Sequence, residues 1–237
     1  MPDAKEKEIL EEKYNDGDVS TLTYIHIGKC GGASINRAII ESPIVNKQFT
    51  KLKDVHIRNP YYQLNAKYLI VVRNPISRAL SAFNWRHYLV VETKQQEFRF
   101  PGEYEVLYKY KNMNNFAESL YDESGDANIT AIKEWMLVHH LKEDISFYLN
   151  PLLPNLKRNN LFAVLTQENL HEDAEKFLGV DSLQQVHKHS DKVSGEMRHL
   201  SNIAKSNLKR YLTDDFHCLE KLFEISDASE EQLKILA

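Results

Sequence analysis

The sequence is poor in the features that mark three common classes of protein. It has two cysteines among 237 residues, Cys30 and Cys218, and a pair so far apart forms neither a disulfide framework nor a zinc cluster. No apolar run reaches the length of a signal peptide or a membrane span. The net charge of −4 gives no reason to expect a nucleic-acid partner. We therefore expect no zinc cluster, no membrane span and no bound nucleic acid, and the cysteine content fits a reducing compartment such as the cytoplasm.

The rest of the composition is that of a globular protein. Hydrophobic residues make up 42% of the chain, which is enough for a core, and the length fits one large domain. The first 18 residues are polar and charged. We expect residues 1–20 to form a flexible arm and residues 21–237 to form a single α/β domain. Nothing in the composition sets an oligomeric state.

Predicted strands alternate with predicted helices along the chain. Strands are expected over residues 21–27, 49–57, 67–72 and 161–166. The run at 67–72 is continuously apolar, as in a strand buried on both faces of a parallel sheet. Helices are expected over residues 34–41, 75–91, 129–142 and 169–178, with some helix in 103–120, a C-cap at Gly179 and a last helix near 229–236. This alternation predicts an α/β fold with a central parallel sheet flanked by helices, followed by a helical C-terminal part.

The stretch YIHIGKCGGASIN, residues 24–36, places a lysine and three glycines between a predicted strand and a predicted helix. Backbone N–H groups at a helix N-terminus attract anions, and glycines let the backbone approach them closely. Lys29 adds a cation and Ser34 a hydroxyl group. We predict a phosphate or sulfate cradle formed by Gly28, Lys29, Cys30, Gly31, Gly32, Ala33 and Ser34. The alternative is a tight turn with a solvated lysine. The order differs from Walker A, in which lysine follows the glycines.

A second stretch, VVRNPISRALSAF at residues 71–83, follows another predicted strand. Arg73 comes where the strand ends, and open α/β sheets bind ligands at that edge. Its guanidinium can donate two hydrogen bonds to one phosphate. Helical spacing puts four side chains of the next helix on one face: Asn74, Arg78, Ser81 and Trp85. We expect Arg73 and Ser81 to hold a second phosphate. A structural role stays open for Arg78, and packing is the favoured role of Trp85.

Together these stretches resemble the nucleotide-binding motifs of sulfotransferases that use 3′-phosphoadenosine 5′-phosphosulfate (PAPS), particularly the carbohydrate sulfotransferases. IHIGKCGGASI is similar to the family's 5′-phosphosulfate loop, and VVRNPISRALSAF is similar to its 3′-phosphate segment. VLTQENLHEDAEKFLGV and LKRYLTDDFHCLEKL are weaker matches. The resemblance implies a P-loop-like three-layer fold, PAPS as co-substrate without a metal, and a saccharide or another hydroxyl compound as acceptor.

The resemblance also implies roles for individual residues. Lys29 would stabilise the charge on the leaving 5′-phosphate. His56 is the candidate general base, with Asp54 and Glu168 as alternatives, and His26 is expected to be packed and hydrogen-bonded. Two lysines of the polar loop at 187–195 would contact the 3′-phosphate: Lys188 and Lys192.

Two departures from the family pattern keep other functions open. Cys30 and Ala33 stand where threonines are usual, so two hydroxyl groups are missing from the loop. A non-catalytic nucleotide-binding module is therefore one alternative. A nucleotide-dependent kinase on a P-loop-like fold is another, and it would need magnesium. His139 and His140 are expected to point apart on a helix and to have a structural role.

Overall fold

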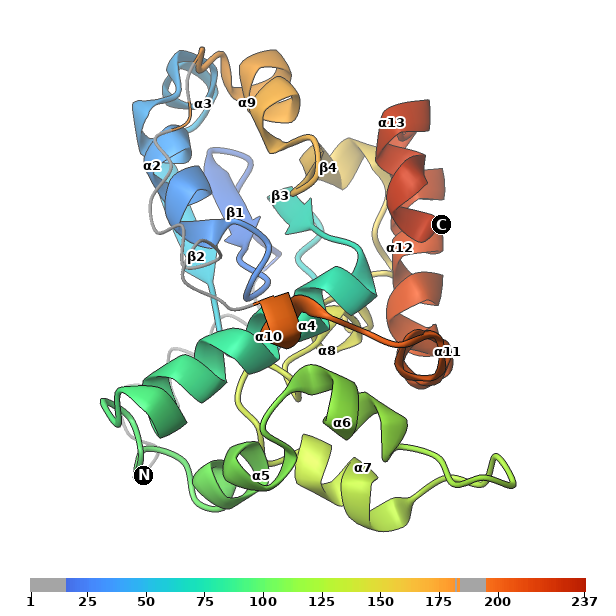
Figure 1. Ribbon diagram of the computed structural model, residues 1–237. Helices are drawn as coiled ribbons and strands as arrows, with labels where there is room; N and C mark the ends of the chain where they lie inside the picture. Colours follow the sequence, from blue (N-terminus) through green and yellow to red (C-terminus); the bar gives the residue numbers. More distant parts are fainter. Residues whose placement is uncertain (1–15, 182, 184–194) are drawn as a thin grey trace, which may run out of the picture. The chain divides into compact units, whose positions relative to one another are not determined.

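The computed structural model describes residues 16–181, 183 and 195–237 (Figure 1). Most of the predicted arm, residues 1–15, therefore lies outside the described residues. Lys188 and Lys192 also lie outside them. The chain divides into two compact units. The first unit combines the residues up to Arg73 with 145–186 and 218–237, and the second combines 74–144 with 187–217.

The first unit is built on a four-stranded sheet. All three strand pairs are parallel and the order is β2-β1-β3-β4. The strands are β1 (Thr21–Ile25), β2 (Lys51–Val55), β3 (Lys67–Val72) and β4 (Leu161–Thr166). The predicted α/β fold with a central parallel sheet is thus confirmed. Its P-loop-like character stays a prediction.

Strand burial follows strand position. β3 lies inside the sheet and is buried from Tyr68 to Val72, which agrees with its apolar run. β2 lies at the edge and exposes most of its side chains. β2 is shorter than the predicted strand 49–57. It ends before Ile57, whose φ of 59° is incompatible with an extended strand.

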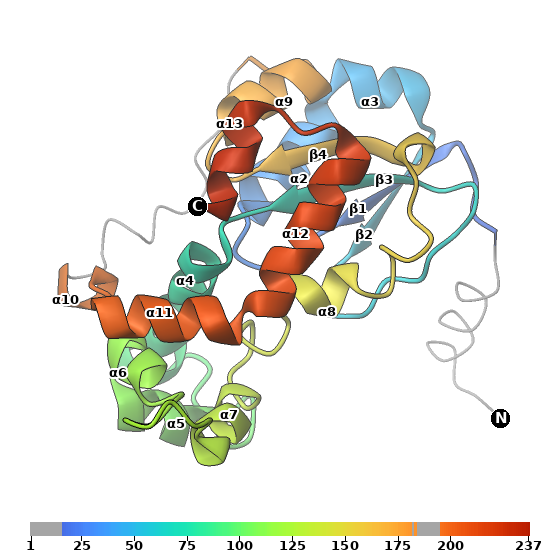
Figure 2. The same ribbon diagram turned by 90° about the vertical axis from the view of Figure 1, so that its right-hand side faces the viewer.

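Helices cover both faces of this sheet. In Figure 2, α2, α3 and α9 lie on one side of the sheet and α8 on the other. One hydrophobic core joins them, with contributions from Ile35 on α2, Tyr148 on α8, Leu178 on α9 and Leu222 on α12. The bounds are α2 (Gly32–Glu41), α3 (Pro43–Gln48), α8 (Ile145–Leu149), α9 (Leu170–Leu178), α12 (Thr213–Ser226) and α13 (Glu230–Leu233). The last boundary between the two units, between His217 and Cys218, falls within α12.

A buried carboxylate joins the end of β4 to α9 and α13. Asp173 accepts hydrogen bonds from the backbone N–H of Thr166 at 2.7 Å and from the side-chain amide of Gln232 at 3.2 Å. The predicted C-cap of α9 is confirmed, because Gly179 adopts the left-handed conformation there. These contacts fix where β4 stops and where α9 begins.

The second unit is helical. Its elements are α4 (Pro75–His87), a π-helical segment (Tyr88–Glu92), α5 (Glu103–Tyr110), α6 (Met113–Glu118), α7 (Ile129–Trp135), α10 (Gly195–Arg198) and α11 (Asn202–Tyr211). The predicted N-cap of α4 is confirmed, since Asn74 accepts a hydrogen bond from the N–H of Ser77 at 3.0 Å. None of the helices in the described part of the chain has the length and apolarity needed to cross a bilayer.

Several predicted helices are shorter than expected. The region 103–120 is divided at Lys111, whose φ of 66° cannot continue an α-helix. The helix predicted over 129–142 ends at Trp135. Beyond it the chain folds back, so that the indole N–H of Trp135 donates to the carbonyl of Leu141 at 3.3 Å.

Candidate nucleotide-binding site

The candidate site lies at the carboxyl edge of the sheet in the first unit. The chain runs from β1 to β2 on one side and then crosses to β3 on the other side of β1. Parallel sheets bind ligands where the strand order reverses in this way. The reversal falls between the carboxyl ends of β1 and β3. The predicted cradle follows β1, and Arg73 follows β3 directly.

The loop between β1 and α2 has an unusual backbone. Lys29 has a φ of 73° and Gly31 a φ of 87°. A non-glycine residue with positive φ is uncommon and costs about 1–3 kcal/mol. Strain of this size collects at ligand sites, where it aims backbone N–H groups at a common point. The sequence did not reveal this conformation of Lys29.

The N-terminus of α2 is suited to an anion. Its N-cap is Gly31, no side chain caps it, and no acidic residue lies in its first turn. The first N–H groups of a helix need partners, and the helix dipole makes that end positive. A phosphate or sulfate group would supply both the acceptors and the negative charge.

The two glycines at the start of α2, the N-cap Gly31 and the first helical residue Gly32, are required for different reasons. A Cβ atom on Gly31 would lie 2.8 Å from Leu170 and 3.6 Å from the Cγ of Gln167, in addition to the strained φ. A Cβ atom on Gly32 would lie 1.7 Å from Nε2 of His26. The loop is therefore packed between the turn after β4 and the His26 ring. Sequence reasoning missed Gln167, although it follows the buried strand β4 directly.

Arg73 joins the two halves of the site. Its Nη1 donates a hydrogen bond to the backbone carbonyl of Lys29 at 3.2 Å. Both side chains are half-buried. The contact draws the guanidinium to the strained part of the loop, so the structure brings together two of the predicted site residues.

Three imidazole and carboxylate groups lie beside the loop. The rings of His26 and His56 stack with centroids 4.1 Å apart, and the ring of Tyr24 stacks on His26 at 5.2 Å. Asp54 Oδ2 lies 3.4 Å from Nδ1 of His26. These contacts agree with the packed, hydrogen-bonded role that was expected for His26. Its pairing with Asp54 was not expected.

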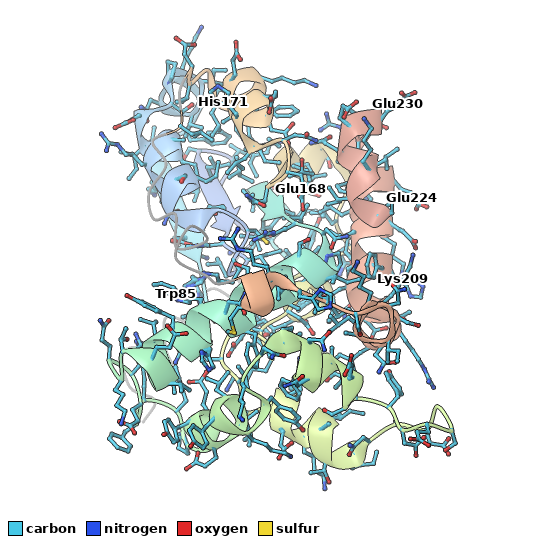
Figure 3. All side chains as sticks on the ribbon, in the orientation of Figure 1. Trp85, Glu168, His171, Lys209, Glu224 and Glu230 are labelled. Carbon is cyan, nitrogen blue, oxygen red and sulfur yellow. The ribbon has the colours of Figure 1, made fainter. Side chains whose placement is uncertain are left out.

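The predicted base has a defined proton position. His56 Nδ1 lies 2.8 Å from the backbone carbonyl oxygen of His26. Because a carbonyl oxygen can only accept, Nδ1 carries the proton and Nε2 is the basic nitrogen of the neutral ring. Glu168, an alternative base, is exposed at the turn between β4 and α9 (Figure 3).

The other predicted cradle residues differ in their surroundings. The Cys30 side chain is buried in the hydrophobic core, so this residue can offer only its backbone. Gly28 is buried and Ser34 is half-buried. Nothing is described of the Ala33 side chain. Ser81 is half-buried on α4, in the second unit.

Arg78 is a structural residue. Its side chain is fully buried, and its Nη2 donates to the backbone carbonyls of His140, at 2.7 Å, and of Glu143. A guanidinium used in this way holds the segment after α7. Trp85 is half-buried on α4 (Figure 3) and stacks on Tyr88 at 6.2 Å, which fits the packing role predicted for it.

His139 and His140 do not point apart. They lie beyond the end of α7, and their ring centroids are 4.2 Å apart. Together with Glu143 they offer three ligand atoms within 4.8 Å of one another. Burial opposes ionisation of Glu143, but its hydrogen bond with His139 and the charge of that ring outweigh burial and hold the pKa of Glu143 below its usual value.

Nearby cations make a metal unfavourable at this cluster. Arg78 binds the backbone of two of its three members, and Lys142 Nζ lies 3.8 Å from Glu143 Oε1. A divalent cation would add to this positive charge. We therefore interpret His139, His140 and Glu143 as a structural cluster and not as a metal site.

The second unit carries a surface groove of about 670 Å³. Its lining combines basic, hydroxyl, amide and apolar side chains: Ile76, Ser77, Leu80, Arg198, His199, Leu200, Ser201, Asn202 and Lys205. No carboxylate belongs to this lining among the side chains that the structure describes. The groove is suited to an anionic ligand with an apolar or ring-shaped body.

Comparison with models of known protein families finds none that matches this chain. A search among curated proteins finds no significant relative.

Proposed function

We propose that the protein is a sulfotransferase that transfers a sulfuryl group from PAPS to an acceptor hydroxyl. The observation that carries the proposal is the hydrogen bond from Arg73 to the carbonyl of Lys29, at the reversal between β1 and β3. It places two cationic residues from two predicted phosphate-binding segments at one edge of the sheet. The sequence resemblance supplies the identity of the nucleotide.

The residues present fit the anionic groups of PAPS. The uncapped N-terminus of α2 and the strained loop would hold the 5′-phosphosulfate. Lys29 would stabilise the negative charge that develops on the leaving phosphate. Arg73 would bind the 3′-phosphate, and the sequence resemblance adds Ser81, Lys188 and Lys192 as further contacts of that phosphate. No metal is needed in this arrangement.

The reaction exchanges one sulfur–oxygen bond for another. The acceptor oxygen bonds to sulfur as the bond from sulfur to the 5′-phosphate oxygen breaks, which releases adenosine 3′,5′-bisphosphate. His56 takes the acceptor proton at Nε2, because Nδ1 is already protonated. Positioning and charge stabilisation provide most of the rate, as in phosphoryl transfer.

We propose a saccharide hydroxyl as the acceptor and the cytoplasm as the location. The sequence resemblance to carbohydrate sulfotransferases supports this choice of acceptor.

The experiment that tests the proposal is transfer of radiolabelled sulfate from PAPS to a panel of neutral and acidic oligosaccharides. We expect labelled product without magnesium, and loss of product in Lys29→Ala. Binding of the nucleotide without transfer to any acceptor would favour the non-catalytic module. Turnover of ATP that requires magnesium would favour the kinase.

A further inference from the structure

His26 contacts both the anion loop and the predicted base. On one side, its Nε2 lies where a side chain on Gly32 would begin, because a Cβ atom there would be 1.7 Å away. On the other side, its ring stacks on His56 with an interplanar angle of 24° and a centroid distance of 4.1 Å. One side chain thus fills the space between the first residue of α2 and the base.

The backbone of His26 also acts on His56. Its carbonyl accepts from Nδ1 of His56 at 2.8 Å, which fixes the tautomer of the base. The same residue continues the pairing of β1 with β2, since its N–H donates to the carbonyl of Val55 at 3.0 Å. The carbonyl that selects the tautomer is therefore held by the sheet.

The position of the His26 ring is set from two further sides. Asp54, on β2, lies 3.4 Å from Nδ1, and Tyr24, on β1, stacks on the ring at 5.2 Å. Burial raises the pKa of Tyr24 well above its usual value, so the neighbouring phenol is neutral. Asp54 is the charged group facing the ring in these contacts. It favours the orientation in which Nδ1 is the donor and Nε2 faces the loop.

The backbone beside the base is strained and supported. Ile57 has a φ of 59°, which is a clear outlier for a β-branched residue. Its N–H donates to the hydroxyl of Tyr148 at 3.0 Å. Strain of this kind persists when the surroundings determine it, and here it turns the chain immediately after His56.

We infer that His26, oriented by Asp54, is a positioning residue that ties the general base to the phosphate loop. It holds the His56 ring in place and makes its position depend on the loop conformation. An anion that orders the loop would therefore also order the base. This inference rests on the proposed function and adds a coupling between nucleotide binding and the base.

The first test is nuclear magnetic resonance of the imidazole nitrogens, in wild type, His26→Ala and His26→Phe. Wild type should show a single Nδ1–H tautomer of His56, and adenosine 3′,5′-bisphosphate should shift its signals. His26→Ala keeps the backbone carbonyl, so the Nδ1–H tautomer should remain, but the His56 ring loses its stacking partner and should lose the shift. His26→Phe, which keeps a stacking ring, should retain the shift. The matched control is His171→Phe, an exposed histidine on α9, which should behave like wild type.

The second test separates positioning from nucleotide binding. In His26→Ala and Asp54→Asn, kcat should fall by about 10- to 100-fold, the usual effect of residues that orient a functional group. KM for PAPS should stay within about twofold because the loop contacts of the nucleotide remain. His26→Phe should lose less activity than His26→Ala.

Two results would overturn the inference. One is an unchanged response of the His56 signals to the bisphosphate in His26→Ala. The other is an equal loss of melting temperature and activity in His26→Ala and His26→Phe, as for a purely structural residue. If wild type binds no bisphosphate, the proposed function fails. Comparison of the His56 ring signals in free wild type and free His26→Ala still decides the positioning role in that case.

Discussion

Arg73 donates a hydrogen bond to the carbonyl of Lys29 across 3.2 Å, although 44 residues separate them in sequence. The contact exists because β3 pairs with β1 and both strands end at the same edge. Lys29 adopts a left-handed conformation next to this bond. A cationic side chain thus supports the backbone of the loop.

Removing Arg73 should weaken nucleotide binding. We expect Arg73→Ala to lose about 1.5–3 kcal/mol of affinity for adenosine 3′,5′-bisphosphate, the scale of a hydrogen bond to a charged group. Calorimetric titration measures this. Arg37→Ala is the control, because Arg37 is exposed on α2 and pairs with Glu41 at 2.8 Å. Equal affinities for the two variants would contradict a phosphate role of Arg73.

Adding one methyl group at Gly32 should displace the His26 ring. The new Cβ atom would lie 1.7 Å from Nε2, so the ring must rotate away from the loop. We expect Gly32→Ala to lose about 1–3 kcal/mol of unfolding free energy, measured by urea denaturation. In Gly195→Ala, the control, the new atom meets nothing within 4 Å. A Gly32→Ala variant as stable as wild type would contradict this packing.

Arg78 should stabilise the fold and should not set nucleotide affinity. Arg78→Met leaves the buried carbonyl of Glu143 and the part-buried carbonyl of His140 without this donor, at a cost of about 1–3 kcal/mol for a buried group. Thermal unfolding should show a clear loss of stability. The control Arg158→Met removes an exposed pair with Asp227 and should have little effect. An Arg78→Met protein that stays stable but loses nucleotide affinity would contradict the structural role of Arg78.

Tyr211 should make the protein sensitive to alkaline pH. Burial, together with the charge of Asp144, raises the pKa of Tyr211 to about 12, whereas a tyrosine in the unfolded chain ionises near its ordinary pKa of 10.0. The folded state therefore keeps a proton that the unfolded state loses. The contribution is complete below pH 10 and is lost as pH rises from about 10 to 12.

Unfolding measured across that pH range checks this prediction. Tyr211→Phe should lose less stability between about pH 10 and 12 than wild type does. Tyr108→Phe, at an exposed position, should retain the wild-type pH dependence. Identical pH profiles for Tyr211→Phe and wild type would show that the phenol does not contribute.

The apolar patterns of the sequence predicted the sheet well. The run at 67–72 became β3, because a strand between two neighbours needs apolar side chains on both faces. The prediction of a helix over residues 129–142 was wrong beyond Trp135, where α7 ends. The positive φ of His140 and the contacts of Arg78 with that segment override its helical pattern. Such tertiary contacts leave no local mark in the sequence.

The residues of the candidate site could likewise be predicted only in part. Lys29 and Arg73 could be found because each follows a predicted strand. The Asp54–His26 pair could not, since it depends on the register of β1 against β2. The burial of Cys30 was also hidden, because a residue in a glycine-rich loop gives no sign of which way its side chain points.

The central claim is that the loop before α2 and Arg73 form a site for a nucleotide with two phosphate positions. Calorimetric titration of adenosine 3′,5′-bisphosphate into the wild-type protein, without magnesium, tests it most directly. The account predicts binding in the micromolar range, clearly tighter than that of adenosine 5′-monophosphate. Absence of binding, or binding only of ATP with magnesium, would contradict it.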